Sequence, residues 1–135
     1  METPLTLKKV LVAEDDRDIQ KVIRMSLKLR GVEYVAFAND GLECLAIVGQ
    51  VQPDLILLDV SMPNLDGYET CRRLKADPKT QSIPVVFLTA KVQRHEKETG
   101  MTAGAQGYLS KPFDPMTLHD QLLEILAKVA IIGAA

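Results

Sequence analysis

Short apolar runs alternate along the chain with longer segments in which apolar residues recur at three- and four-residue steps. Runs of the first kind are typical of buried strands, and segments of the second kind are typical of amphipathic helices. The strand cores are predicted at residues 10–13, 34–38, 55–58, 85–88 and 108–109. The helices are predicted at residues 16–30, 41–48, 67–76 and 92–102, and from 115 to about 130.

The spacing within each helix also predicts which side chains it buries. These are Ile19, Val22, Ile23 and Leu27 in the first helix, Leu42, Leu45 and Ala46 in the second, Tyr68, Cys71 and Leu74 in the third, and Leu118, Leu122, Ile125, Leu126 and Val129 in the fifth. Asp16 and Asp114 are predicted N-caps, and Pro115 suits a first helical position. Segment 92–102 is mostly polar and contains Gly100, so we expect a helix of low local stability there.

Five strands alternating with five helices imply βαβ crossovers, a parallel sheet, and helices on both faces of that sheet. The runs 55–58 and 85–88 are apolar throughout, as strands that are buried on both faces must be. The sequence therefore predicts a doubly wound α/β fold. The length of 135 residues suits one domain, predicted over residues 1–135 with a core from about 8 to 130.

Composition narrows the possible classes. Hydrophobic residues make up 47% of the chain and charged residues 25%, as in soluble globular proteins. The net charge of −2 predicts no broad basic surface, so we expect no direct contact with nucleic acid and no binding to membranes. Cys44 and Cys71 are expected to be reduced core thiols, and His95 and His119 to lie on solvated helix faces. Without a signal peptide or a membrane-length apolar run, the sequence indicates a cytoplasmic protein.

Polar residues follow the predicted strands at the edge where open parallel sheets bind their ligands. Glu14 and Asp15 follow the first strand, Asp59 the third and Thr89 the fourth, and Lys111 comes shortly after the fifth. Carboxylates that lie close together repel, and a divalent cation such as Mg²⁺ would compensate their charge, with Lys111 as a second positive group. Each residue alone has a simpler explanation in packing or solvation, so the hypothesis depends on their combination.

Four motifs at these strand ends resemble the receiver domains of two-component response regulators. They are residues 10–16 (VLVAEDD), 57–67 (LLDVSMPNLDG), 88–90 (LTA) and 104–113 (GAQGYLSKPF). The resemblance implies a flavodoxin-like (βα)5 fold with strand order 2-1-3-4-5. It also implies that Asp59 is the phosphoacceptor, and that Glu14, Asp15, Asp59 and the backbone carbonyl of Ser61 hold Mg²⁺ (or Mn²⁺). The implied phosphoryl donor is a histidine kinase or a histidine phosphotransfer protein.

The same resemblance implies how the phosphoryl group is bound and sensed. Lys111, after which a cis peptide bond to Pro112 is expected, and Thr89 would bind phosphoryl oxygens. Thr89 and Tyr108 would then act as switch residues for the surface formed by the fourth helix, the fifth strand and the fifth helix. That surface would bind a downstream target or effector domain, or form a homodimer.

The lifetime of the phosphoryl group depends, by the same resemblance, on the residues two positions after the acceptor and two after the threonine. These positions hold Ser61 and Lys91. Neither side chain offers a carboxylate or an amide that would orient an attacking water, so a long-lived phosphoryl state is expected.

Three alternatives stay open from the sequence. A haloacid-dehalogenase-like phosphatase would need a leaving-group acid two residues after Asp59, where this chain has Ser61, so we expect no turnover enzyme. A nucleotide- or flavin-binding module would need a Gly-rich turn where the chain has Glu14 and Asp15. A degenerate receiver would act only as a binding module. The chain is either a standalone regulator or a portion of a longer protein.

Overall fold

One parallel sheet organises the molecule. The computed structural model describes residues 6–90, 99 and 101–134, with side chains as far as Lys128. The strands are β1 (Lys9–Ala13), β2 (Tyr34–Ala38), β3 (Leu55–Asp59), β4 (Val85–Thr89) and β5 (Gly107–Ser110). Their order in the sheet is β2-β1-β3-β4-β5, and every neighbouring pair is parallel. The predicted α/β fold and its strand order are confirmed.

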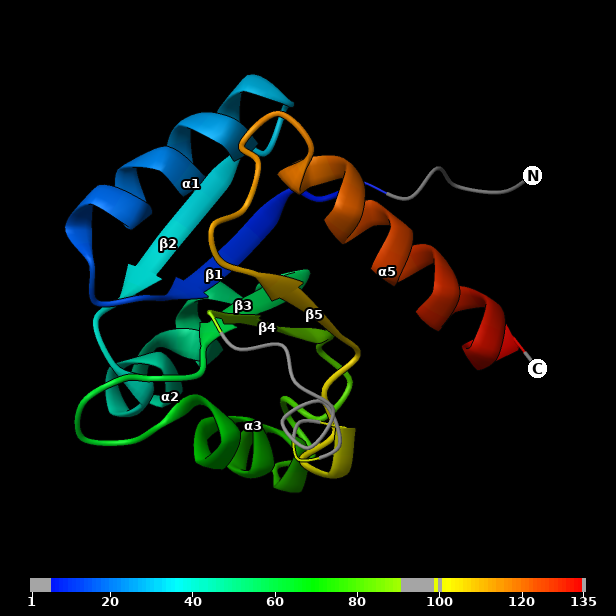
Figure 1. Ribbon diagram of the computed structural model, residues 1–135. Coiled ribbons are helices and arrows are strands. Elements are labelled where there is room, and N and C mark those ends of the chain that lie inside the picture. The colour runs from blue at the N-terminus through cyan, green and yellow to red at the C-terminus, as the bar shows by residue number, and fades with distance from the viewer. Residues whose placement is uncertain (1–5, 91–98, 100, 135) are drawn as a thin grey trace.

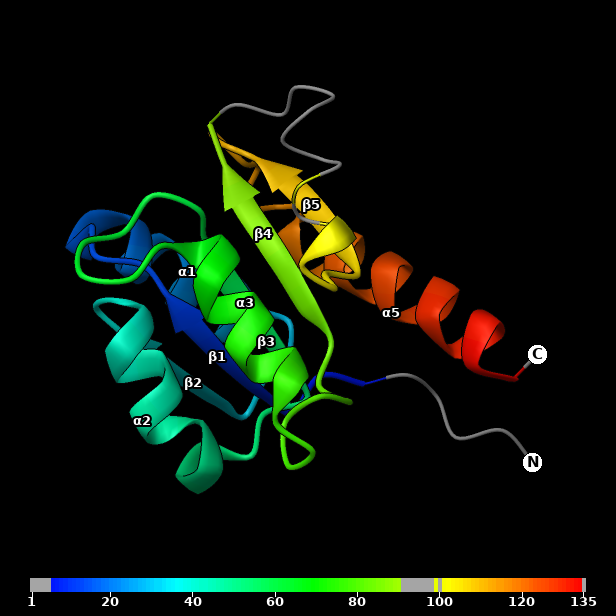
Figure 2. The same cartoon turned by 90° about the horizontal axis from the view of Figure 1, so that it is seen from below.

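Helices cover both faces of this sheet (Figures 1 and 2). Helices α1 (Arg17–Leu29) and α5 (Leu118–Ala134) pack on one face, and α2 (Gly41–Val51) and α3 (Gly67–Ala76) pack on the other. Alternate side chains of the fully buried strand β3 enter the two cores. Each such Leu or Ile contributes about 1.5–3 kcal/mol through burial. Burial of the central strands therefore stabilises the sheet. The candidate site residues lie at the ends of the strands and in the loops that follow them.

Aspartates begin three of the helices and so fix where the adjoining loops turn. Asp16 caps α1, as predicted, and accepts hydrogen bonds from the backbone amides of Asp18 (2.9 Å) and Ile19 (3.2 Å). Asp40 and Asp66 cap α2 and α3 in the same way. A side-chain oxygen in this place satisfies amides that the first helical turn leaves unpaired.

Two predictions about buried helix faces are wrong in part. In α1, Val22 is 41% exposed, while Ser26 is buried together with the predicted Ile23 and Leu27. In α2, Leu42 is 49% exposed and Ala46 is also exposed. The buried face of α2 is instead formed by Gly41, Cys44, Val48 and Val51. Both helices carry more apolar residues than one face can bury, so spacing alone does not determine which face turns inward.

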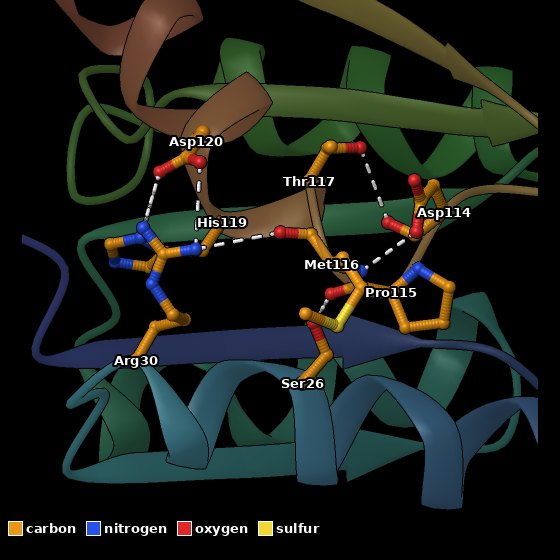
Figure 3. A network of polar contacts seen from close by, with 8 residues as sticks. All are labelled: Ser26, Arg30, Asp114, Pro115, Met116, Thr117, His119 and Asp120. Atoms are coloured by element: carbon orange, nitrogen blue, oxygen red, sulfur yellow. Dashed lines mark hydrogen bonds and ion pairs between the residues drawn. The ribbon is translucent and has the colours of Figure 1, made fainter.

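The fifth helix begins later than predicted, at Leu118 rather than Pro115. Asp114 still accepts a hydrogen bond from the Met116 amide (2.9 Å), but residues 115–117 form a turn. Side chains of α1 and of its C-cap residue Arg30 bind carbonyl groups of this turn: Ser26 Oγ donates to the Pro115 carbonyl (2.5 Å) and Arg30 Nη1 to that of Met116 (3.4 Å) (Figure 3).

Other residues discussed above are placed as follows. Burial raises the pKa of the Cys44 thiol to about 12 and that of the Cys71 thiol to about 11, consistent with the predicted core positions. His119 is not solvated as predicted, because only 12% of its side chain is exposed.

The predicted helix 92–102 falls mostly on residues 91–98 and 100, which lie outside the described residues, as do Lys91 and His95. Among the described helices, none combines the length and the hydropathy needed to cross a bilayer.

Candidate functional site

The loop after β1 holds one buried and one exposed carboxylate. The Glu14 amide donates to the Ala38 carbonyl (3.0 Å), which fixes the end of β1 against β2. Glu14 is only 1% exposed, and its Oε2 accepts a hydrogen bond from the Asp16 amide (3.1 Å). Asp15 is exposed. The N-cap role of Asp16 therefore leaves Glu14 and Asp15 as the acids at this edge of the sheet.

Asp59 is the last residue of β3 and is 6% exposed. Its Oδ1 accepts a hydrogen bond from the Ser61 amide (3.2 Å). The loop that follows folds back tightly, because the Gly67 amide donates to the Val60 carbonyl (2.9 Å). A Cβ atom at Gly67 would collide with the carbonyl oxygen of Asp59, so this position requires glycine. The motif after the third strand thus shapes the surroundings of the Asp59 carboxylate.

Lys111 reaches the same place from the end of β5. Its Nζ lies 2.6 Å from Glu14 Oε1 and 3.3 Å from Asp59 Oδ2. The Lys111 amide donates to the Thr89 carbonyl (2.8 Å), which joins the ends of β4 and β5. The Lys111-Pro112 peptide bond is cis, as the resemblance implied. The structure therefore places one ammonium group between two buried carboxylates.

The surroundings change the proton affinity of this pair. Burial raises the pKa of Glu14, and the contact with Lys111 offsets only part of that shift. Burial acts to lower the pKa of Lys111, but its contact with Glu14 and the charge of Asp59 outweigh burial and raise it. The acids around Lys111 therefore favour its charged form, while burial favours the protonated form of Glu14.

The acidic residues fit a divalent cation. Glu14, Asp15 and Asp59 each offer one carboxylate oxygen, and these oxygens all lie within 4.8 Å of one another. Three carboxylates face one ammonium group, so the site keeps an excess of negative charge. Oxygen donors from a few carboxylates are what Mg²⁺ prefers in proteins.

The remaining predicted residues are placed at the same end of the sheet or next to it. Thr89 is the buried last residue of β4 and pairs in register with Ser110. Tyr108 is half-buried, and its ring centroid lies 5.4 Å from that of Phe87. Ser61 is exposed beside Asp59. Lys91 lies outside the described residues.

An apolar groove beside Lys111 was not predicted from the sequence. A cavity of about 450 Å³ is bordered by Lys111, Val22 and Phe113, and a second of about 320 Å³ is bordered by Val22, Leu29 and Met116. Val22 borders both cavities, and we call the apolar surface around them the α1 groove. It is defined by Ile19, Val22, Met25, Leu29, Phe113 and Met116. The surplus of apolar residues in α1 was the signal in the sequence that pointed to this surface.

Comparisons with known proteins identify the family of this chain. The family model for the response regulator receiver domain matches residues 10–123. The chain is 42% identical over 106 residues to the "DNA-binding dual master transcriptional regulator RpaA" of Synechocystis, which covers 78% of this chain and 44% of that protein. It is 40% identical over 121 residues to the response regulator MprA of Mycobacterium leprae, which covers 90% of this chain and 49% of that protein.

A solved structure gives the same result for the fold. The chemotaxis response regulator CheY4 of Vibrio cholerae superposes with a TM-score of 0.83 at 33% identity, which covers 89% of this chain and 99% of that one.

The comparisons also correct one expectation. The chain spans less than half the length of RpaA and of MprA, and the first of these is named as DNA-binding. Proteins of this kind therefore do include regulators that contact DNA, and the prediction of no direct contact with nucleic acid is not supported. The family model, the two relatives and the solved structure all indicate the same family, and the chain belongs to the response regulator receiver domains of two-component systems.

Proposed function

We propose that Asp59 accepts a phosphoryl group from a phosphohistidine of a histidine kinase or a histidine phosphotransfer protein. A carboxylate oxygen of Asp59 attacks phosphorus, the bond from phosphorus to the donor's imidazole nitrogen breaks, and the imidazole leaves with the electron pair. The product is an acyl phosphate on Asp59. The observation that carries this proposal is the position of Lys111 Nζ, 3.3 Å from a buried carboxylate that ends a central strand.

Different residues around Asp59 would bind the cation and the phosphoryl oxygens. Glu14, Asp15, Asp59 and the backbone carbonyl of Ser61 would hold Mg²⁺ (or Mn²⁺). The bound cation supplies positive charge for the phosphoryl oxygens. Lys111 neutralises a second phosphoryl oxygen, for which it must give up part of its contact with Glu14. The Thr89 hydroxyl binds a further oxygen, which links phosphorylation to the end of β4.

We expect stoichiometric phosphorylation rather than turnover. A phosphatase of the haloacid-dehalogenase type needs an acid to protonate its leaving group, and Ser61 occupies that position. Ser61 and Lys91 likewise offer no group that would orient a hydrolytic water, which supports a long-lived phosphoryl state. The protein would therefore work as a switch.

The α1 groove supports a docking site for the phosphoryl donor. It runs from Lys111 along α1 and exposes the apolar side chains of Met25 (65%), Leu29 (81%) and Met116 (78%). Burying each such side chain against a partner contributes about 1.5–3 kcal/mol. A donor helix that carries its histidine at one end of this groove would reach Asp59.

The output would pass through the region after the site. Strand β5 lies beside α5 in Figure 1, and the Tyr108 side chain of this strand packs against Phe87 in the core on the α2 and α3 face of the sheet. A change of its rotamer on phosphorylation would alter the surface of the fourth helix, β5 and α5, to which a target, an effector domain or a second copy would bind. We further propose that residues 1–135 form one domain that acts in the cytoplasm.

Phosphorylation by acetyl phosphate and Mg²⁺, followed by intact mass measurement, tests the proposal. The native chain should gain one phosphoryl group and Asp59→Asn none. Asp120→Asn, which removes an exposed carboxylate, serves as the matched control and should react like the native chain. No mass gain in the native chain would overturn the proposal and favour a binding module, and a mass gain in Asp59→Asn would assign the phosphoryl group to another residue.

A further inference from the structure

Strand β2 leaves one edge of the sheet open. It is the first strand in the order β2-β1-β3-β4-β5 and lies at the edge in Figure 1. The Tyr34 amide donates to the Lys8 carbonyl (2.9 Å), and the Ala38 carbonyl accepts from the Glu14 amide (3.0 Å). Because alternate residues of a parallel strand bond to the same neighbour, the backbone groups of Val35 and Phe37 point away from β1. An edge of this kind is a template for another strand.

A groove follows this open edge. One cavity of about 420 Å³ and another of about 310 Å³ both border Arg24 and Phe37, so the two lie next to each other. We call them together the β2 groove. Its walls are Arg17, Lys21 and Arg24 from α1, and Ile47, Gln50 and Val51 from α2.

The two walls differ in charge. Arg17, Lys21 and Arg24 are spaced four and three residues apart, so they share one face of α1. The Arg24 guanidinium carbon lies 5.0 Å from the centroid of the Phe37 ring, which holds this cation beside the strand. No carboxylate borders either cavity among the residues that the structure describes, although the whole chain carries a net charge of −2. The groove is therefore a local cationic surface on an acidic protein.

We propose that the β2 groove binds an extended acidic segment of a partner protein, which adds as a strand beside β2. Side chains of an added strand alternate between the two faces of the sheet. Those on one face meet the cations of α1, and those on the other meet Ile47 and Val51 of α2. The segment bound best therefore alternates acidic and apolar residues, while its backbone pairs with Val35 and Phe37.

We favour a peptide over a nucleic acid as the ligand because of the backbone of the open strand as well as the charge of the groove. A nucleic acid would neutralise the three cations, but it has no peptide groups to pair with a strand and no apolar side chains for the α2 wall. The proposal concerns a surface separate from Asp59, so phosphorylation and peptide binding succeed or fail independently.

The test uses the full ¹⁵N-labelled chain and a short, blocked peptide that alternates Glu and Val. The amide signals of Val35 and Phe37 should move on titration. Lys21→Glu and Arg24→Glu should each weaken binding about ten-fold or more. Lys79→Glu makes the same change of charge at an exposed residue outside the groove and should leave the affinity within about two-fold. Because Lys21→Glu keeps the contact between Arg24 and Phe37, its effect does not depend on a change in the fold.

Two further peptides distinguish strand addition from non-specific electrostatic attraction. A peptide of the same composition with Glu and Val in separate blocks should bind much more weakly, and an alternating Lys and Val peptide should not bind. Equal binding of the block peptide, or unmoved signals of Val35 and Phe37, would overturn the proposal. So would a single-stranded DNA oligonucleotide that binds more tightly than the alternating peptide and moves the same signals, since the groove would then be a nucleic-acid surface.

Discussion

Two ion pairs of the same length lie in very different surroundings. Lys111 Nζ is 2.6 Å from Glu14 Oε1, and Arg30 Nη2 is 2.6 Å from Asp120 Oδ1. In the first pair, 19% of the lysine side chain and 1% of the glutamate side chain are exposed. In the second, 43% of the arginine and 52% of the aspartate are exposed. The shortest distances in the two pairs are equal, but the access of water to the pairs differs strongly.

This difference determines what each pair does. Water and salt screen an exposed pair, which contributes at most about 1 kcal/mol to stability. Removing one partner of a buried pair leaves a charge without compensation and costs about 3–5 kcal/mol. Arg30 and Asp120 join the ends of α1 and α5 (Figure 3), whereas Lys111 and Glu14 keep charges together at a site where a phosphoryl group would need them. We therefore expect the buried pair to matter for the proposed phosphorylation, and the exposed pair to make only a small contribution to stability.

Lys111→Met removes the buried pair, and of the substitutions considered it should have the largest effect on phosphorylation. Loss of the ammonium that would stabilise the transferred phosphoryl group should lower the rate of phosphorylation by acetyl phosphate about 100-fold or more. The rate is followed by intact mass at several times. Lys79→Met, the loss of an exposed ammonium, is the control and should react at the native rate. A rate for Lys111→Met within about two-fold of native would contradict the proposed role of Lys111.

Glu14→Gln should weaken the binding of divalent cations. It removes one of the three carboxylates whose oxygens lie within 4.8 Å of one another, so we expect the dissociation constant for Mg²⁺ to rise at least about ten-fold. The chain contains no tryptophan, so isothermal titration calorimetry is the suitable measurement. Asp120→Asn should leave the constant unchanged, because Asp120 lies in the exposed pair. Native affinity in Glu14→Gln would exclude Glu14 as a ligand.

The pH dependence of stability offers a sharper view of the buried pair. Burial raises the pKa of Glu14 above its ordinary value of 4.5, although Lys111 offsets part of the shift. Between pH 4.5 and this raised pKa, the folded chain therefore keeps a proton on Glu14 that the unfolded chain has lost. The free energy of unfolding should then fall as pH rises from 4.5 through the raised pKa.

Urea unfolding of metal-free protein at several pH values measures this change. Glu14→Gln cannot ionise at this position, so its profile should lack the fall. If the two profiles superimpose across that range, the ionisation of Glu14 does not change the free energy of unfolding, and this prediction is wrong.

The sequence predicts the ends of the strands better than the contacts between side chains. Glu14, Asp59 and Thr89 could be placed at one edge because each follows directly on a strand core, and parallel strands end at the same side. Lys111 was expected near Asp59, yet its shortest contact is with Glu14 (2.6 Å). That contact depends on the rotamer of a long side chain and on the burial of Glu14, and neither is encoded in the strand pattern.

Helix faces were predicted less well where apolar residues are in surplus. Val22 and Leu42 were assigned to the core by spacing, but both are exposed at more than 40%. In α1 the surplus forms the α1 groove, so the wrong prediction marks a candidate docking surface. The pair of Arg30 and Asp120 joins residues 90 positions apart, and the pattern within a single helix carries no information about such a contact.

Breaking the exposed pair should have the smallest effect. In a double-mutant cycle of Arg30→Gln and Asp120→Asn, we expect a coupling energy of about 0.2–1 kcal/mol from urea unfolding. Raising the salt concentration to about 1 M should remove most of it, because the Debye length then shrinks to about 3 Å. A coupling above about 2 kcal/mol that survives such salt would mean that water does not reach this pair. The exposed pair would then be about as strong as the pair of Lys111 and Glu14, and the difference in burial would no longer explain a difference in their contributions to stability.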